Sequence, residues 1–350
     1  MSRLVMVFVV LIISLAVAIG VLWKEQASFV VSPIGKLMEK PLDKYTIENL
    51  SKRQSVGSQI VLDEAVATTS AYTVYQFHFT TADPTSSLDK SSGLRGAVKK
   101  MTGLALVPHS DSGNQYIKQY PVIVQFRGYV DREKYSPGEG TRHSSEVFAQ
   151  HGFLTLAPDF LGYGGSASPS ADALEERFQT YTTALDLIAS VKTLPMADPD
   201  NIGIWGHSNG GQIALTVLEI LHTPIPASLW APVSKPFPYS ILYYTDDALD
   251  RGKLLRRLLA KFEDNYDVEL YSLTNYLDRL AGPMLMHQGG SDDAVPQAWS
   301  DQFVKKLKEQ EKDVTYYIYP GADHNMSPDA WNTVVLRDVA FFQKWLKSGL

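Results

Sequence analysis

Hydrophobic and polar positions divide the 350-residue chain into three regions. The first, residues 1–23, contains an uncharged apolar run, "LVMVFVVLIISLAVAIGVLW", from Leu4 to Trp23. Residues 24–66 are polar and mixed, which is typical of a linker or stalk that becomes helical. Residues 67–350 carry short strand-like and helix-like patterns in alternation, and we expect them to form one globular domain.

The apolar run is long enough to cross a hydrocarbon core of about 30 Å. A segment in lipid must satisfy its backbone hydrogen bonds internally, so it would be a helix. The alternative is a signal peptide cleaved after Ala16-Val17-Ala18, which would lead to a secreted protein. Because the apolar run continues to Trp23, the pattern favours an uncleaved anchor. Basic residues flank both ends, and we expect the short tail inside and the remaining chain outside the cytoplasm.

The domain begins with two strand patterns. "AYTVYQFHFTTA" (71–82) alternates with period two, and "MTGLALVP" (101–108) follows after a polar loop. We expect these segments to form an antiparallel pair. From Pro121 onwards, short apolar runs alternate with helical stretches: "VIVQF", "FLTLAPDF", "IGIW", "PMLMH" and "VTYYIY". This alternation predicts an α/β fold with a mostly parallel sheet and helices on both faces.

One insertion interrupts the alternation. Residues 235–281 carry apolar residues at helical spacing, among them Leu255, Leu259 and Phe262. We interpret this insertion as a small helical cap over the carboxyl edge of the sheet. The alternative is that its helices are ordinary crossover helices on the flank of the sheet.

Composition narrows the classes of function. The chain has 45% hydrophobic and 20% charged residues, as in globular proteins, and its formal net charge of -6 gives no reason to expect a nucleic-acid partner. The absence of cysteine excludes disulfides, thiol nucleophiles and cysteine-ligated zinc. No H-E-x-x-H motif is present, so we expect neither a catalytic metal nor another cofactor. Composition leaves the oligomeric state open.

A candidate nucleophile lies in "IWGHSNGGQIAL". Residues 206–210 match the pattern G-x-S-x-G, between an apolar strand and a helix-like segment. In that context the pattern forces Ser208 onto a tight turn with its hydroxyl exposed above the sheet. The pattern alone also occurs by chance, so the assignment depends on an acid and a base elsewhere in the chain.

Both partners follow in the required order. "QGGSDDAVP" supplies Asp292 and Asp293 after one strand, and "PGADH" supplies His324 after the next. Nucleophile, acid and histidine occur in this order in α/β-hydrolases. Because parallel sheets gather their sites at the carboxyl ends of the strands, we expect Ser208, His324 and one of the two aspartates to meet there.

From about Met101 to its end, the chain resembles the catalytic domain of prolyl oligopeptidase-like serine peptidases, in the α/β-hydrolase superfamily. The resemblance rests on "DPDNIGIWGHSNGG", "QGGSDDAVP" and "YPGADH". It implies that residues 67–350 form an α/β-hydrolase catalytic domain. It also implies Ser208 as the nucleophile, Asp292 rather than Asp293 as the acid, and His324 as the base.

The chain departs from the family at two points. It has no room for the large propeller of the family's well-known members, and Arg127-Gly128 stands where His-Gly is common. The expected oxyanion hole uses the backbone N–H groups of Tyr129 and Asn209, which do not depend on the side chain at position 127. For Arg127 we consider a structural ion pair and binding of a substrate carboxylate. His207 is expected to be a packed residue.

These features predict a membrane-anchored serine hydrolase that cleaves peptide bonds through a Ser-His-Asp triad and an acyl-enzyme. The expected partners are a peptide or small ester substrate and the membrane. A carboxylesterase on the same scaffold is the first alternative, because a fold does not determine the substrate. A non-catalytic binding or scaffolding protein is the second, although such proteins commonly lose one member of the triad.

Overall fold

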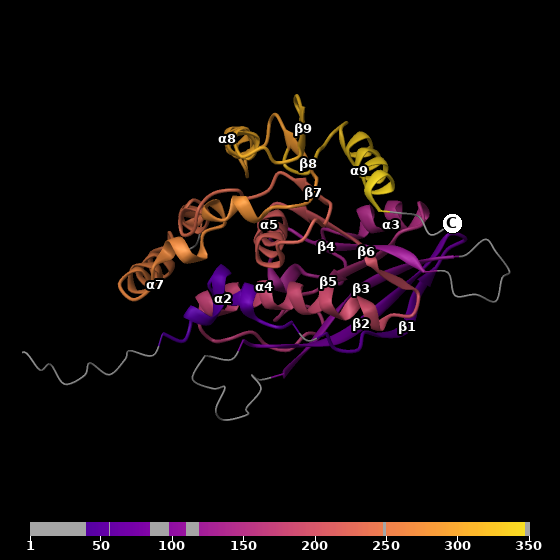
Figure 1. Cartoon of the computed structure of the whole chain (residues 1–350), viewed down its shortest axis with the longest axis horizontal. Helices are drawn as coiled ribbons and strands as arrows, with labels where there is room; N and C mark the ends of the chain where they lie inside the picture. The colour runs from indigo at the N-terminus through magenta and orange to yellow at the C-terminus, as the bar shows by residue number, and fades with distance from the viewer. Residues whose placement is uncertain (1–39, 56, 85–97, 110–118, 248–249, 347–350) are drawn as a thin grey trace, which may run out of the picture. The chain divides into compact units, whose positions relative to one another are not determined.

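The computed structural model of the chain describes residues 40–55, 57–84, 98–109, 119–247 and 250–346 (Figure 1). The expected anchor, residues 1–23, lies outside these ranges. Within them, no helix combines the length and apolar character needed to span a membrane. The chain divides into two units between Pro41 and Leu42, and the unit from Leu42 onwards is described below.

Nine strands of the described residues form one sheet, in the order β1-β2-β3-β5-β4-β6-β7-β8-β9. Their bounds are β1 Val61–Thr68, β2 Tyr72–Ala82, β3 Val98–Pro108, β4 Tyr120–Phe126, β5 Leu154–Pro158, β6 Ala197–His207, β7 Ala227–Trp230, β8 Met284–Gly289 and β9 Val314–Tyr319. β2 and β3 pair antiparallel, as the sequence predicted, and β5, β4 and β6 to β9 pair parallel. The predicted α/β fold is confirmed.

Helices alternate with the strands along the chain. The α-helices are α2 Ile47–Lys52, α3 Arg142–Gln150, α4 Ala173–Ser190, α5 Asn209–Leu221, α6 Tyr239–Leu242, α7 Lys253–Glu263, α8 Gln297–Glu309 and α9 Trp331–Trp345. Short 3-10 turns are η1 Asp43–Tyr45, η3 Arg132–Lys134, η4 Val191–Thr193, η5 Thr245–Asp247, η6 Val268–Tyr271, η7 Leu273–Asn275 and η8 Leu277–Arg279.

Helices cover both faces of the sheet. This coverage explains why the sequence of the central strand β4 is rich in apolar residues. Val122 and Val124 belong to the core that contains Phe178 of α4 and Ile213 of α5. Ile123 belongs to a second core, with residues of α3 and α9. Since successive side chains of a strand point to opposite faces, every residue of such a central strand is buried.

The apolar run "VTYYIY" predicted that β9 is covered on both faces, and this prediction is wrong. Its residues Tyr317 and Ile318 are exposed, because β9 lies at the edge of the sheet and pairs only with β8 in the described residues. The sequence pattern did not distinguish an apolar edge strand from a central one.

The boundary predicted between linker and domain also differs from the structure. Residues assigned to the linker, 24–66, include α2 and most of β1. Three apolar side chains of η1 and α2, those of Tyr45, Ile47 and Leu50, are each 1% exposed. Burial of these side chains joins the segment from Leu42 to the domain, although its polar composition resembles a linker.

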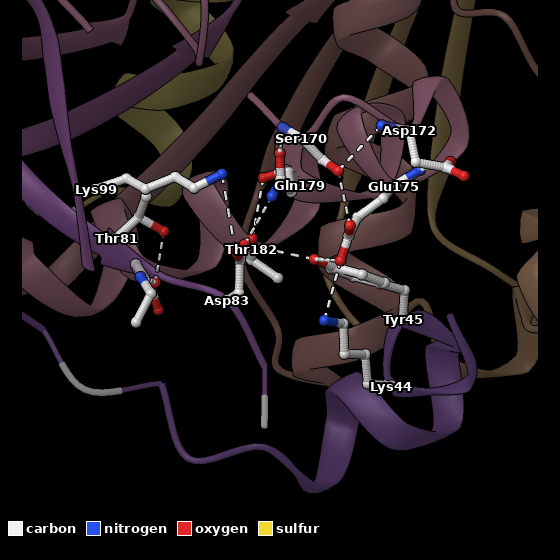
Figure 2. A network of polar contacts seen from close by, with 12 residues as sticks. Lys44, Tyr45, Thr81, Asp83, Lys99, Ser170, Asp172, Glu175, Gln179 and Thr182 are labelled. Atoms are coloured by element: carbon white, nitrogen blue, oxygen red, sulfur yellow. Dashed lines mark hydrogen bonds and ion pairs between the residues drawn. The ribbon is translucent and has the colours of Figure 1, made fainter. Parts of the chain in front are cut away.

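A polar network also holds this segment (Figure 2). The Tyr45 hydroxyl donates to Glu175 of α4, and Lys44 forms an ion pair of 3.0 Å with the same carboxylate. Asp83, at the end of β2, accepts a hydrogen bond from Gln179 of α4. Burial, followed by the charges of Asp83 and Glu175, raises the pKa of Tyr45, so its hydroxyl remains a donor at neutral pH.

The insertion 235–281 divides into two parts. Phe262 of α7 and Tyr271 of η6 pack on Phe178 of α4, and η7 and η8 contact α5. These contacts favour the alternative of helices on the flank of the sheet. Nearer its start, the Tyr244 hydroxyl donates to the carbonyl of Ala294, so this part contacts the loop that follows β8.

Candidate active site

Ser208 occupies a strained turn between β6 and α5. Its φ of 56° and ψ of -119° lie in a region that L-residues rarely adopt. Glycines make the turn possible: a Cβ added to Gly210 would lie 1.9 Å from the carbonyl oxygen of Phe126. A Cβ added to Gly206 would lie 2.6 Å from the carbonyl oxygen of Gly210. The motif therefore brings the start of α5 against the ends of β4 and β6, with Ser208 at the turn.

Asp292 and His324 lie side by side at the ends of β8 and β9. His324 Nδ1 is 2.8 Å from Asp292 Oδ2, and the aspartate side chain is 0% exposed. Asp293, the alternative acid, is exposed. Parallel pairing of β8 with β9 explains the contact, because it brings the two loops that follow these strands together.

Both carboxylate oxygens of Asp292 accept further hydrogen bonds. The backbone N–H groups of Ala294 and Val295 donate to Oδ1 at 3.0 and 2.8 Å, and Gln288 Nε2 donates to Oδ2 at 3.0 Å. Burial opposes ionisation of this carboxyl, but the hydrogen bond from His324, the charge of His324 and the other donors outweigh burial and lower its pKa. Asp292 is thus a carboxylate that orients the imidazole.

His207, the residue before Ser208, contacts the His324 loop. Its Nε2 donates to the carbonyl oxygen of His324 at 2.9 Å, and the two rings lie 4.6 Å apart. Desolvation, followed by repulsion from His324, lowers the pKa of His207 to about 4. His207 therefore stays neutral near neutral pH, and it links the loop of His324 to the turn of Ser208. Among the described residues, no hydrogen bond joins the Ser208 hydroxyl to the His324 ring.

The expected oxyanion donors lie on either side of Ser208. A Cβ added to Gly128 would lie 3.2 Å from Ser208 Cβ, so the backbone leading to Tyr129 runs beside Ser208. Asn209 is the first residue of α5, where backbone N–H groups have no partner within the helix. Within the described residues, neither the N–H of Tyr129 nor that of Asn209 donates a hydrogen bond. Both remain available to a substrate oxygen.

The Tyr129 side chain does not contribute a hydrogen-bond donor to the expected oxyanion hole in this structure. It is 76% exposed, and its hydroxyl donates to Asp131 at 3.0 Å. This hydrogen bond, with partial burial, raises the pKa of Tyr129. The backbone of Tyr129, rather than its hydroxyl, is the group near Ser208.

A cavity of about 190 Å³ opens beside these donors. Its lining includes Tyr129 and Asn209, apolar side chains of Phe160 and Ile213, and two cations, Arg127 and Arg177. Neither the loop of Asp292 nor the loop of His324 contributes to the lining.

Arg127 does not form the structural ion pair that was considered from the sequence. Its guanidinium donates to the carbonyl oxygens of Gly128 and Asp159, at 2.9 and 3.2 Å, and lies over the rings of Tyr135 and Tyr163. No ion pair involves it in the described residues. The carbonyl of Gly128 and the N–H of Tyr129 belong to one peptide group, so the bond from Arg127 also orients that N–H.

Sequence reasoning missed Gln288 and Arg177. Gln288 is the residue before the Gly-Gly pair at the end of β8, and only the fold shows that its amide supports Asp292. Arg177 lies within α4, about 30 positions before Ser208, and no motif marks it. Cavity-lining residues such as this one become visible only when the helices are placed on the sheet.

Comparison with known proteins identifies the family. Residues 140–349 match the prolyl oligopeptidase family. Dipeptidyl peptidase family member 6 of Caenorhabditis elegans is 23% identical over 251 residues, which are 69% of this chain and 32% of the relative. Dipeptidyl aminopeptidase BIII of Pseudoxanthomonas mexicana is 24% identical over 200 residues, 52% of this chain and 27% of the relative. The chain thus spans about a third or less of these relatives.

Two solved structures share the fold. Acetyl xylan esterase 1 from Thermoanaerobacterium sp. JW/SL YS485 superposes with a TM-score of 0.58 at 17% identity, over 87% of this chain and 94% of the esterase. Dipeptidyl peptidase 4 of Porphyromonas gingivalis superposes with a TM-score of 0.53 at 18% identity, over 81% of this chain and 41% of the peptidase. Both likenesses support the α/β-hydrolase fold.

Proposed function

The chain belongs to the prolyl oligopeptidase family and is a serine hydrolase, and from this premise we propose that it cleaves peptide bonds through a Ser208–His324–Asp292 triad. The observation that carries the assignment is the 2.8 Å contact between His324 Nδ1 and the buried carboxylate of Asp292. The His324 carbonyl also accepts a hydrogen bond from His207, the residue before Ser208. A neutral imidazole with its proton on Nδ1 leaves Nε2 free to accept a proton.

In the proposed reaction, Ser208 Oγ attacks the acyl carbon while His324 Nε2 accepts the hydroxyl proton. The tetrahedral oxyanion accepts hydrogen bonds from the N–H groups of Tyr129 and Asn209. His324 then donates its proton to the leaving amine, and water repeats the sequence on the acyl-enzyme. Hydrogen bonds between catalytic groups often tighten only when substrate binds, so we expect the Ser208–His324 bond to form in the substrate complex.

A carboxylesterase is the second candidate function. The acetyl xylan esterase matches this chain over 94% of its own length, whereas the dipeptidyl peptidase matches over 41%. The same triad serves esters and amides, so the substrate decides between the two functions.

The first experiment is labelling with a fluorophosphonate, with Ser208→Ala as the control. Stoichiometric labelling that the variant abolishes supports the triad, and its absence would favour a non-catalytic protein. The second compares kcat/KM for p-nitrophenyl esters with that for aminoacyl and peptidyl anilides. Rapid ester cleavage without any anilide or peptide turnover would contradict the peptidase assignment and support a carboxylesterase.

We also propose that residues 4–23 anchor the protein in a membrane with its catalytic domain outside the cytoplasm. The support is the uncharged apolar sequence alone. Alkaline carbonate extraction of membranes containing the full chain should leave the protein in the pellet, and deletion of residues 1–23 should release it. An N-terminus beginning after Ala18 in the mature protein would instead indicate a cleaved signal and secretion.

A further inference from the structure

We propose that the cavity beside Ser208 is an acyl pocket that selects substrates with a carboxylate a few atoms from the reacting carbonyl. Arg177 is the residue that binds this carboxylate. The inference rests on the proposed function and assigns a substrate class to its site. It applies to peptides and esters alike, because the acyl part is common to both.

The position of the cavity identifies the side of the substrate it receives. A carbonyl carbon under attack directs its oxygen to the oxyanion donors and its leaving group to His324, which must protonate it. The cavity is lined by the donor residues Tyr129 and Asn209 and by none of the residues that follow β8 or β9. The leaving group therefore lies outside the cavity, and the acyl chain extends into it.

Arg177 has the properties of an anion-binding residue without its anion. Its Nη2 donates to the neutral Gln212 side chain at 2.8 Å, and its Nε is buried without a hydrogen-bond partner. In the part of the chain that the structure describes, no carboxylate forms an ion pair with it. Glu176, the acid that lines the same cavity, pairs instead with Arg132.

Other groups make the cavity favourable for negative charge. Arg127, a second cation in the lining, is 6% exposed, and its Nε also has no partner. Asn209, the first residue of the 13-residue helix α5, lines the cavity, and helix N-termini favour anions. Asp159, near Arg127, is 1% exposed and its oxygens accept hydrogen bonds from Tyr135 and Thr102. Because Asp159 also interacts electrostatically with Arg127, Arg177 is the cation of the lining that has no carboxylate partner among the described residues.

The size of the cavity suits a short acyl chain. An engineered cavity of about 150 Å³ can hold a benzene molecule. The 190 Å³ observed here therefore accommodates an acyl chain of about six heavy atoms with a terminal carboxylate. Phe160 and Ile213 provide apolar contacts for the methylene groups, and the guanidinium binds the end of the chain.

The test uses matched p-nitrophenyl esters, with spontaneous hydrolysis subtracted from enzyme-free reactions. Glutarate and adipate monoesters are each compared with an isostere in which an isopropyl group replaces the carboxylate. A charge-assisted hydrogen bond predicts a ratio of kcat/KM, acidic over neutral, of about 10 to 100. Arg177→Gln should reduce this ratio to about one, and Arg177→Glu should bring it below one. Arg257→Gln, which removes an exposed cation on α7, should leave the ratio unchanged.

Three outcomes would contradict the inference. One is equal turnover of acidic and neutral esters by the unaltered protein, and another is a preference that persists in Arg177→Gln. The third is a preference for acid on the leaving-group side, measured with acetate esters of 4-hydroxybenzoate and 4-hydroxybenzamide. Failure of the proposed function is distinct from these, because neither ester would then be cleaved and a fluorophosphonate would not label Ser208.

Discussion

Replacing Asp292 with asparagine is expected to lower kcat by about 10³- to 10⁴-fold while the protein remains folded. The side-chain amide has the shape of the carboxylate but only one acceptor oxygen. The two backbone donors on Oδ1, from Ala294 and Val295, favour placing that oxygen there. The NH₂ group then faces His324 Nδ1, which must become an acceptor with its proton on Nε2. In this tautomer the ring cannot accept the proton of Ser208.

The magnitude follows from the lost charge. Asp292 Oδ2 and His324 Nδ1 are 2.8 Å apart, and unit charges at about 4 Å attract by about 4 kcal/mol at an effective dielectric constant of 20. Loss of this stabilisation of the imidazolium corresponds to about 10³-fold in rate, and the unfavourable tautomer lowers the rate further.

The assay is p-nitrophenyl butyrate hydrolysis under saturating substrate, together with the rate of fluorophosphonate labelling. Asp293→Asn is the matched control, since this neighbouring carboxylate is exposed and we expect kcat within about twofold. Circular dichroism and melting temperature establish that both variants fold. An Asp292→Asn enzyme within tenfold of the parent rate, or an equal loss in Asp293→Asn, would refute the assigned acid.

Three further predictions concern His207 and two buried carboxyl groups. His207→Ala should lower kcat about tenfold by removing the donor to the His324 carbonyl, and His207→Gln, which keeps an N–H donor, should restore part of the activity in the same assay. Asp338→Asn should lower the melting temperature by about 5–10 °C, because its buried carboxylate accepts hydrogen bonds from Ser228, His287 and two tryptophans. Burial raises the pKa of Glu219 in the folded protein well above 4.5. As the pH rises above 4.5, the unfolded chain releases this proton while the folded protein keeps it, so the folded protein loses stability. Glu219→Gln should remove this loss of stability. The melting temperature of the variant minus that of the parent should therefore be at least about 2 °C larger at pH 8 than at pH 5. The same difference at both pH values would contradict the assignment.

The strand segments of the parallel sheet and the candidate catalytic residues could be predicted from the sequence because both depend on local pattern and chain order. Continuous apolar runs such as "VIVQF" require a strand covered on both faces, and glycines around Ser208 permit a turn that other residues cannot form. Once the sheet is parallel, residues that follow neighbouring strands must share an edge. Asp292 and His324 were therefore expected together, whereas the choice against Asp293 rested on the family resemblance.

Tertiary structure decided what depends on side chains from distant elements. The segment around Tyr45 belongs to the domain because a few apolar side chains are buried and one hydroxyl reaches α4, which its polar composition conceals. Arg177 lines the cavity because α4 packs beside α5, and Arg127 lies over aromatic rings and forms no ion pair in the described residues. Local sequence determines the strand, the turn and the helix, because their periodicity and backbone limits act over a few residues. The surroundings of each charge are set by packing between elements, which only the assembled fold specifies.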